Sequence, residues 1–126
     1  MKVLDNLLYT KDHEWLRIEE NRIYIGITDF AQSELGDIIF VELPSIEDSV
    51  KIGDPIGTIE AVKTVADVYS PITGKIVEIN NKIEDQPELI NTDPYGDGWI
   101  ACVEASATLK SIETLTSKDY LNFIGK

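Results

Sequence analysis

Residues 57–71 have the sequence GTIEAVKTVADVYSP, in which two short runs of β-forming residues meet at Val62 and Lys63. We predict a β-hairpin over residues 55–71 with these two residues at its tip. Such a hairpin pairs Ala61 with Thr64, Ile59 with Ala66, and Gly57 with Val68. Because side chains alternate between the faces of a strand, these six residues share one face. That face is small and apolar, and we expect it to pack against a second sheet.

The opposite face of the predicted hairpin is more polar and consists of Thr58, Glu60, Val65, Asp67 and Tyr69. Glu60 and Asp67 are diagonal neighbours across the two strands, and Lys63 projects beyond both. Two-residue hairpin turns favour Asn-Gly or Asp-Gly because a type I′ turn needs positive φ angles. Val62-Lys63 fits neither pattern, and such inconsistencies collect at functional sites. An exposed lysine is nevertheless ordinary when considered alone.

Length and composition indicate a single soluble domain over residues 1–126. The chain is 43% apolar and 27% charged, which is typical of a globular protein with a modest core. Its net charge of −12, from 11 basic and 23 acidic residues, argues against nucleic acids and anionic membranes as partners. Both of those partners bind cationic surfaces.

Several sequence features favour a cytoplasmic location. The sequence contains no run of about 18 apolar residues, so no membrane span is predicted. Residues 1–5, MKVLD, are too few and too acidic to begin a signal or transit peptide. Cys102 is the single cysteine and cannot form an internal disulfide, which suits a reducing compartment.

The remaining patterns predict a mainly β fold. Alternating apolar residues predict strands at 15–18, 23–27, 37–43, 75–80 and 99–104. A short helix is expected at 29–35, with Thr28 as its N-cap and Gly36 as its C-terminal stop, and one helical turn is expected at 88–90. We predict two small sheets in a flattened sandwich with short helices.

The last part of the chain has a helical pattern. Leu109, Ile112 and Leu115 recur at three-residue spacing, and Ser117 can cap a second helical piece. We therefore predict a C-terminal helical segment over about 107–124 that packs against the sheets.

Catalytic interpretations find little support in the residues. His13 is the only histidine, which excludes multi-histidine metal sites, and we expect it to be structural, as we expect Cys102 to lie in the core. A Schiff-base lysine is activated by burial or by cationic neighbours. Lys63, at a hairpin tip flanked by Glu60 and Asp67, has neither.

Residues 59–71, with Gly53 ten residues before Lys63 and Gly74 eleven after it, resemble a lipoyl attachment hairpin. Within that class the chain resembles the glycine cleavage system H protein family over nearly its whole length. Further matching blocks are YTKDHEW at 9–15, IGITDFAQ at 25–32, LGDI at 35–38, VELP at 41–44, ELIN at 88–91 and DPYGDGW at 93–99. The family's usual Glu-Ser-Val-Lys-Ala is EAVKT at 60–64 here, a departure that keeps the lysine.

This resemblance implies the barrel-sandwich hybrid fold of lipoyl and biotinyl carriers. It also implies a non-catalytic carrier with lipoate amide-linked to Lys63 by a lipoate ligase or lipoyltransferase. Three partner enzymes follow: the pyridoxal-phosphate-dependent glycine decarboxylase (P protein) loads an aminomethyl group, and the folate-dependent aminomethyltransferase (T protein) removes it. Dihydrolipoyl dehydrogenase (L protein) then takes the reducing equivalents. A carrier that visits three enzymes is expected to be a monomer.

The family's swinging arm is thought to fold back against the carrier near its first strand and the hairpin. Glu14 and Asp67 occupy matching positions, so we predict that they contact the aminomethyl-loaded arm. An anionic lining can hold an ammonium group and exclude water. Asp12 and Glu60 are further candidates, and for Glu60 an ordinary surface acid is the simpler interpretation.

Three alternatives to the glycine cleavage carrier stay open. The chain could relay or carry lipoyl groups for other lipoate-dependent complexes. A biotin carrier is disfavoured because that class flanks its lysine with methionines, whereas Val62 and Thr64 stand here. A β-sandwich without any prosthetic group is the simplest alternative.

Overall fold

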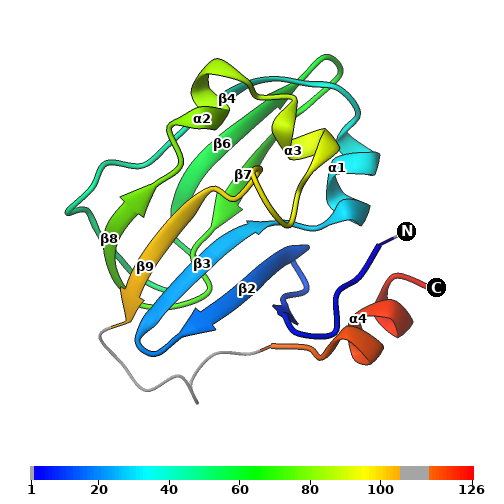
Figure 1. Cartoon of the computed structure of the whole chain (residues 1–126), viewed down its shortest axis with the longest axis horizontal. Coiled ribbons are helices and arrows are strands. Elements are labelled where there is room, and N and C mark those ends of the chain that lie inside the picture. Colours follow the sequence, from blue (N-terminus) through cyan, green and yellow to red (C-terminus); the bar gives the residue numbers. More distant parts are fainter. Residues whose placement is uncertain (1, 106–113) are drawn as a thin grey trace.

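The computed structural model describes residues 2–105 and 114–126 and is mainly β (Figure 1). Within these residues six strands form one antiparallel sheet, in the order β1-β2-β3-β9-β8-β5. Its strands are β1 (Leu8–Tyr9), β2 (Glu14–Glu19), β3 (Arg22–Ile27), β5 (Ser49–Val50), β8 (Gly74–Ile79) and β9 (Ala101–Ala105). A second sheet of three strands has the order β4-β6-β7. It consists of β4 (Ile38–Glu42), β6 (Pro55–Ala61) and β7 (Val65–Tyr69). The predicted sandwich of two sheets is thereby confirmed.

The hairpin formed by β6 and β7 has the predicted register. Ile59 pairs with Ala66 and Gly57 with Val68, and the amide of Ala61 donates to the carbonyl oxygen of Thr64 over 2.8 Å. Positive φ angles at described non-glycine residues occur at 13, 20 and 47, so the tip at 62–63 is not a type I′ turn.

The core lies between the two sheets, and the hairpin contributes its apolar face to it. Ile59, Ala61 and Val68 are buried there with side chains from β3, β8 and β9. Thr64 is the exception to the predicted apolar face, because it stands at the tip beyond the opposing sheet and is exposed. Cys102 is buried in β9, as predicted.

Glycine occupies the two positions that flank the hairpin for different structural reasons. Gly53 has a φ angle of 89°, a conformation that side-chain-bearing residues rarely adopt. At Gly74 a Cβ atom would collide with the carbonyl oxygen of Glu104 on the neighbouring strand. Gly53 lies in the turn before β6, and Gly74 is the first residue of β8, so the two positions bracket the hairpin.

The first helix has the predicted limits. It is α1 (Asp29–Leu35), its N-cap Thr28 accepts a hydrogen bond from the amide of Ala31, and Gly36 follows with a φ angle of 79°. Two further helices lie between β8 and β9, namely α2 (Lys82–Asp85) and α3 (Leu89–Thr92). Only α3 matches a prediction; both are single turns without a side-chain cap.

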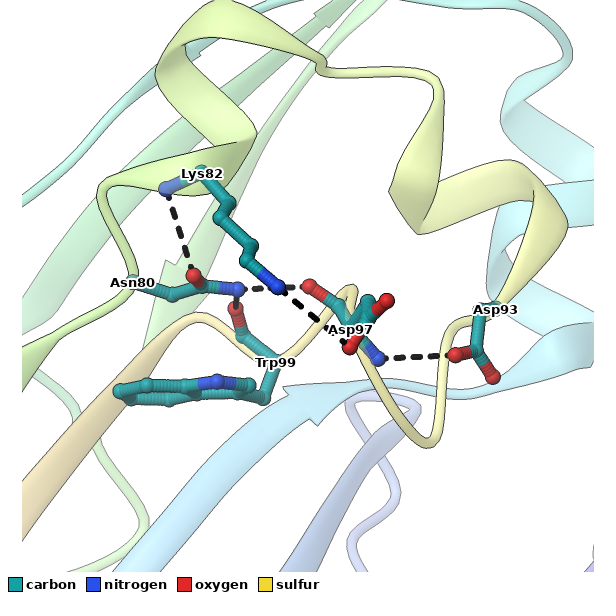
Figure 2. A network of polar contacts seen from close by, with 5 residues as sticks. All are labelled: Asn80, Lys82, Asp93, Asp97 and Trp99. Atoms are coloured by element: carbon teal, nitrogen blue, oxygen red, sulfur yellow. Dashed lines mark hydrogen bonds and ion pairs between the residues drawn. The ribbon is translucent and has the colours of Figure 1, made fainter.

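A network of polar contacts joins the end of β8 to the loop before β9 (Figure 2). The side-chain amide of Asn80 donates to the carbonyl oxygens of Asp97 and Trp99 over 2.6 and 2.7 Å. The amide of Asp97 donates to the carboxylate of Asp93 over 2.9 Å, and Lys82 lies 3.9 Å from the carboxylate of Asp97. These contacts fix residues 97–99 as a loop, so β9 begins at Ala101 rather than at the predicted residue 99.

The C-terminal helix differs in its start from the prediction. It is α4 (Ser117–Phe123), and its N-cap is Thr116, whose hydroxyl accepts from the amide of Asp119. Ser117 is not the cap, because its hydroxyl donates to Asp5. Leu115 is not helical either: it forms a β-bridge with Tyr9, with hydrogen bonds of 2.9 and 2.6 Å. The predicted helical positions 109 and 112 lie outside the described residues.

A second, aromatic cluster attaches α4 to the sandwich. The ring of Tyr120 stacks on that of Tyr9 at a centroid distance of 4.8 Å, and Trp15 lies in the same cluster. The indole of Trp15 donates to the carbonyl oxygen of Pro94. Figure 1 shows the result, in which both chain ends lie on the same side of the molecule next to α4.

Candidate functional site

Lys63 stands fully on the surface at the tip of the β6–β7 hairpin. The amide of Val62 donates to the carbonyl oxygen of Asp37 over 3.1 Å, which ties the tip to the connection between α1 and β4. A hollow of about 370 Å³ lies there, lined by residues 33–37, Val62 and Lys63. The lysine is therefore exposed at the end of a surface hollow.

Asn91 holds the wall of this hollow in place. Its side-chain amide nitrogen donates to Gln32 of α1 and to the carbonyl oxygen of Gly36, over 3.0 and 2.8 Å. Its side-chain oxygen accepts from the amide of Ile38 over 2.9 Å. One side chain from α3 thus fixes the end of α1 and the start of β4.

A second hollow, of about 280 Å³, lies between α1 and β7. Its lining includes Asp12, His13, Phe30 and Asp67, and it shares residues 34 and 35 with the hollow at Lys63. Asp67 is exposed on the edge strand β7 and accepts a hydrogen bond from the hydroxyl of Thr58 over 3.1 Å.

Glu14 lies at a third hollow, also of about 280 Å³, which shares Asp12 with the second. Its side chain is only 2% exposed. One carboxyl oxygen accepts from the amide of Tyr69 over 2.7 Å, and the other accepts from the hydroxyl of Thr10 over 3.3 Å. Burial raises the pKa of Glu14 to about 8, because desolvation outweighs these hydrogen bonds, and the nearby charge of Asp12 raises it further.

His13 is held rigidly beside the second hollow. Its φ angle is 65°, and its Nδ1 lies 2.9 Å from the hydroxyl oxygen of Tyr120. The ring packs against Phe30 and Phe123 at centroid distances of 5.0 and 5.8 Å. Burial lowers the pKa of His13 despite the opposing charges of Asp12 and Glu34, so the neutral ring is favoured.

The hydroxyl of Tyr120 lies between His13 and Thr28. The pKa of Tyr120 is raised to about 12 by burial, so its hydroxyl keeps its proton. The hydroxyl oxygen of Thr28, which accepts from the amide of Ala31, lies 2.7 Å from the hydroxyl oxygen of Tyr120. The hydroxyl of Tyr120 therefore links His13 to the N-cap of α1.

The predicted site residues are therefore brought together only in part. Asp12, Glu14, Asp67 and Lys63 all line hollows of which each shares one or two wall residues with the next. Glu60 does not line these three hollows: it is exposed on the outer face of the small sheet, opposite Val65. Asp67 lies on the edge strand β7, so it lines the second hollow and also borders the outer face of the small sheet.

Sequence reasoning missed Thr10, Phe30, the amide of Tyr69, and Tyr120 as parts of this region. A resemblance block contains Thr10 and another contains Phe30, but neither has a local pattern that marks it as a site residue. Tyr120 reaches His13 across 107 positions of the sequence. Such a contact leaves no signal in the spacing of residues.

Comparisons with known proteins agree with one another. A family model described as "Glycine cleavage H-protein" matches residues 7–126. The glycine cleavage system H protein of Coprothermobacter proteolyticus is 49% identical over 127 residues and is covered completely, as is this chain. That of Listeria monocytogenes is 52% identical over 120 residues, with 95% of this chain and 96% of the relative covered.

A solved structure is also similar. The crystal structure of a glycine cleavage system H protein from Mycobacterium marinum superposes with a TM-score of 0.91 at 38% sequence identity. The alignment covers 98% of this chain and 100% of that one.

Proposed function

Because the chain belongs to the glycine cleavage H-protein family, we propose that Lys63 is its lipoyl attachment residue. The family supplies the lipoyl carrier of the glycine cleavage system, so this chain is a non-catalytic carrier that works with the other components of that system. The observation that carries the proposal for Lys63 is its exposed amine beside a series of three hollows, neighbours of which share wall residues and the last of which contains Glu14.

The residues that line these hollows suit a long, mostly apolar arm. Phe30, Ala31 and Leu35 of α1 offer apolar contacts in the second hollow, and carboxylates stand at its rim. When attached, lipoate supplies a sulfur pair that carries the one-carbon amine and then two electrons. Lys63 itself supplies an exposed primary amine at a tip anchored to Asp37, so attachment needs no unfolding of the hairpin.

Glu14 and Asp67 are proposed to hold the amine of the aminomethyl group that the carrier transports. An ammonium group gains charge-assisted hydrogen bonds from a carboxylate, most strongly where water is excluded. Glu14 is buried and has a pKa of about 8, so it is largely protonated near neutral pH while no cation is near. An arriving ammonium favours the carboxylate form, so binding displaces the proton of Glu14 and leaves an ion pair.

The partners are proposed from the family. The chain would accept lipoate from a lipoate ligase or lipoyltransferase and meet the glycine decarboxylase, the aminomethyltransferase and dihydrolipoyl dehydrogenase in turn. We further propose that it acts in the cytoplasm as a monomer, with residues 1–126 forming one lipoyl-binding domain. The net charge of −12 favours partner surfaces with basic rims. Among the described residues no helix has the length and apolar character needed to cross a bilayer.

Intact mass and peptide mapping after incubation with lipoate, ATP and a lipoate ligase test the attachment site. Lys63→Arg is compared with Lys51→Arg, an exposed lysine on the turn before β6. We expect an increase of about 188 Da, the mass of an amide-linked lipoyl group, on wild type and Lys51→Arg only. Modification at another lysine, or none, would refute the proposal.

Glycine decarboxylase and labelled bicarbonate are then added, and exchange of the label into glycine is measured. Exchange that requires Lys63 supports the glycine cleavage carrier. Modification at Lys63 without exchange would point instead to a lipoyl relay for other complexes.

The roles of Glu14 and Asp67 have a separate test. The aminomethyl-loaded carrier is kept without the aminomethyltransferase, and the release of its cargo in water is timed. We expect Glu14→Gln and Asp67→Asn to speed the release by about tenfold, the effect of one lost charged hydrogen bond. Glu84→Gln, at an exposed acid of α2, serves as the control. Equal release from all four proteins would remove both residues from the site.

A further inference from the structure

The outer face of the small sheet is unusually apolar next to the hairpin tip. Phe40 of β4, Glu60 of β6 and Val65 of β7 form one cross-strand row on this face. The side chains of Phe40 and Val65 are 52% and 60% exposed, and Val62 at the tip is 66% exposed. Single exposed apolar residues are normal, whereas several gathered at one place indicate an interaction surface.

Carboxylates surround this row. Glu60 lies within it, and the next row contains Glu42, Thr58 and Asp67. All three acids are exposed. Within β4, β6, β7 and their connecting tip, Lys63 is the only basic residue. A partner that covers the face would therefore present apolar side chains flanked by arginine or lysine.

The side of the tip that faces α1 is tied to the chain itself. The amide of Val62 is bonded to Asp37, and Ala61 pairs with Ile38 of β4. Residues 33–37 form the wall of the hollow beside Lys63. The exposed apolar surface next to the tip is the outer face, with Phe40 and Val65.

We propose that this outer face, made of Phe40, Val62 and Val65 with Glu42, Glu60 and Asp67, is the docking surface for the enzyme that acylates Lys63. The proposal rests on the proposed attachment of lipoate at that lysine.

The acylating enzyme differs from the other partners in how closely it must approach Lys63. Acylation requires the bare amine of Lys63 to enter an active site, so the enzyme must contact the surface directly around the tip. Enzymes that act on the cargo meet it at the far end of a long arm and can dock elsewhere.

The chemical step involves the chain only through Nζ of Lys63. An acyl adenylate formed from lipoate and ATP is the acyl donor. The unprotonated amine attacks its carbonyl carbon, an amide bond forms, and the acyl–phosphate bond breaks. AMP leaves and one proton passes to solvent, so no oxidant or reductant is needed.

The test measures lipoylation kinetics of the full chain with lipoate, ATP and a lipoate ligase. We expect Phe40→Ser to lower kcat/KM at least about tenfold, as is usual for the loss of an aromatic anchor at an interface. Val65→Ser should lower it less, and both variants should reach the wild-type rate at saturating carrier. The matched control is Ile46→Ser, because Ile46 is 50% exposed on the loop between β4 and β5.

A binding measurement supplies a readout independent of turnover. In the Lys63→Arg background, which cannot be acylated at this position, calorimetric titration with the ligase should give a Kd that rises at least about tenfold on adding Phe40→Ser. Glu42→Gln should reduce the salt dependence of Kd, because one carboxylate of the rim is removed. Thermal melts check that each variant is folded.

Equal kcat/KM and Kd for Phe40→Ser and Ile46→Ser would overturn the docking surface, whereas failure of wild type to be acylated at Lys63 would overturn the proposed function instead. The glycine–bicarbonate exchange of carriers lipoylated beforehand is compared as well. If Phe40→Ser slows only this exchange, the face belongs to glycine decarboxylase, and the assignment to the acylating enzyme is wrong.

Discussion

Replacement of Glu14 by glutamine is expected to change how stability depends on pH. In the folded chain the pKa of Glu14 is raised to about 8 by burial, against 4.5 for the exposed side chain. The folded state therefore binds a proton more tightly than the unfolded state. The stabilisation that this proton gives the folded state is complete below pH 4.5 and is lost as the pH rises through 8.

The magnitude follows from these two pKa values. Between pH 5 and pH 7 the contribution of Glu14 to the free energy of unfolding should fall by about 2–3 kcal/mol. For a chain of this size that corresponds to roughly 10 °C in melting temperature. Glutamine has nearly the same shape, can accept the hydrogen bond from the amide of Tyr69, and does not titrate.

The assay is urea unfolding of wild type and Glu14→Gln from pH 5 to pH 8.5. His13 contributes with the opposite sign, because its lowered pKa makes stability rise as the pH passes 6.5. His13 is present in both proteins, so its contribution cancels in the difference between their free energies of unfolding. We expect the two to have similar stability at pH 5 and the variant to be the more stable by about 2–3 kcal/mol at pH 7. Parallel pH profiles would refute the reasoning.

Two further predictions concern the contacts that hold the site. Tyr120→Phe removes the hydroxyl shared by His13 and Thr28 and should cost about 1–2 kcal/mol of unfolding free energy in urea; a change below about 0.3 kcal/mol would contradict the assigned bonds. Asn80→Ala leaves the carbonyl oxygens of residues 97 and 99 without their side-chain donor and should cost about 2–3 kcal/mol in the same assay. An unchanged unfolding midpoint would show that water replaces the amide.

The central hairpin and α1 could be predicted because their determinants are local. Alternation and the position of the turn specify the pairing of Ile59 with Ala66, and Thr28 and Gly36 mark the two ends of α1. The start of α4 could not be predicted, because the backbone of Leu115 is engaged by Tyr9, more than a hundred positions away. Non-local pairing overrides a three-residue spacing that is otherwise typical of a helix.

The residues of the candidate site could be proposed from the sequence, whereas their geometry could not. The resemblance selected Lys63, Glu14 and Asp67, but the burial of Glu14 follows from the packing of β2, the loop before it and the end of β7. The composition of residues 9–15 contains no sign that Glu14 is enclosed while its neighbour Asp12 is exposed. Glu60 lies apart from the hollows because it is on the outer face of the small sheet, which meets solvent.

The β-bridge between Tyr9 and Leu115 has a consequence for biosynthesis. Leu115 also lines the hollow around Glu14, so this part of the wall is translated after the other residues that line it. The hairpin with Lys63 is translated some fifty residues earlier. A nascent chain therefore exposes Lys63 before the wall at Leu115 exists, and a chain terminated before residue 114 would keep the hairpin but lack that wall of the hollow around Glu14.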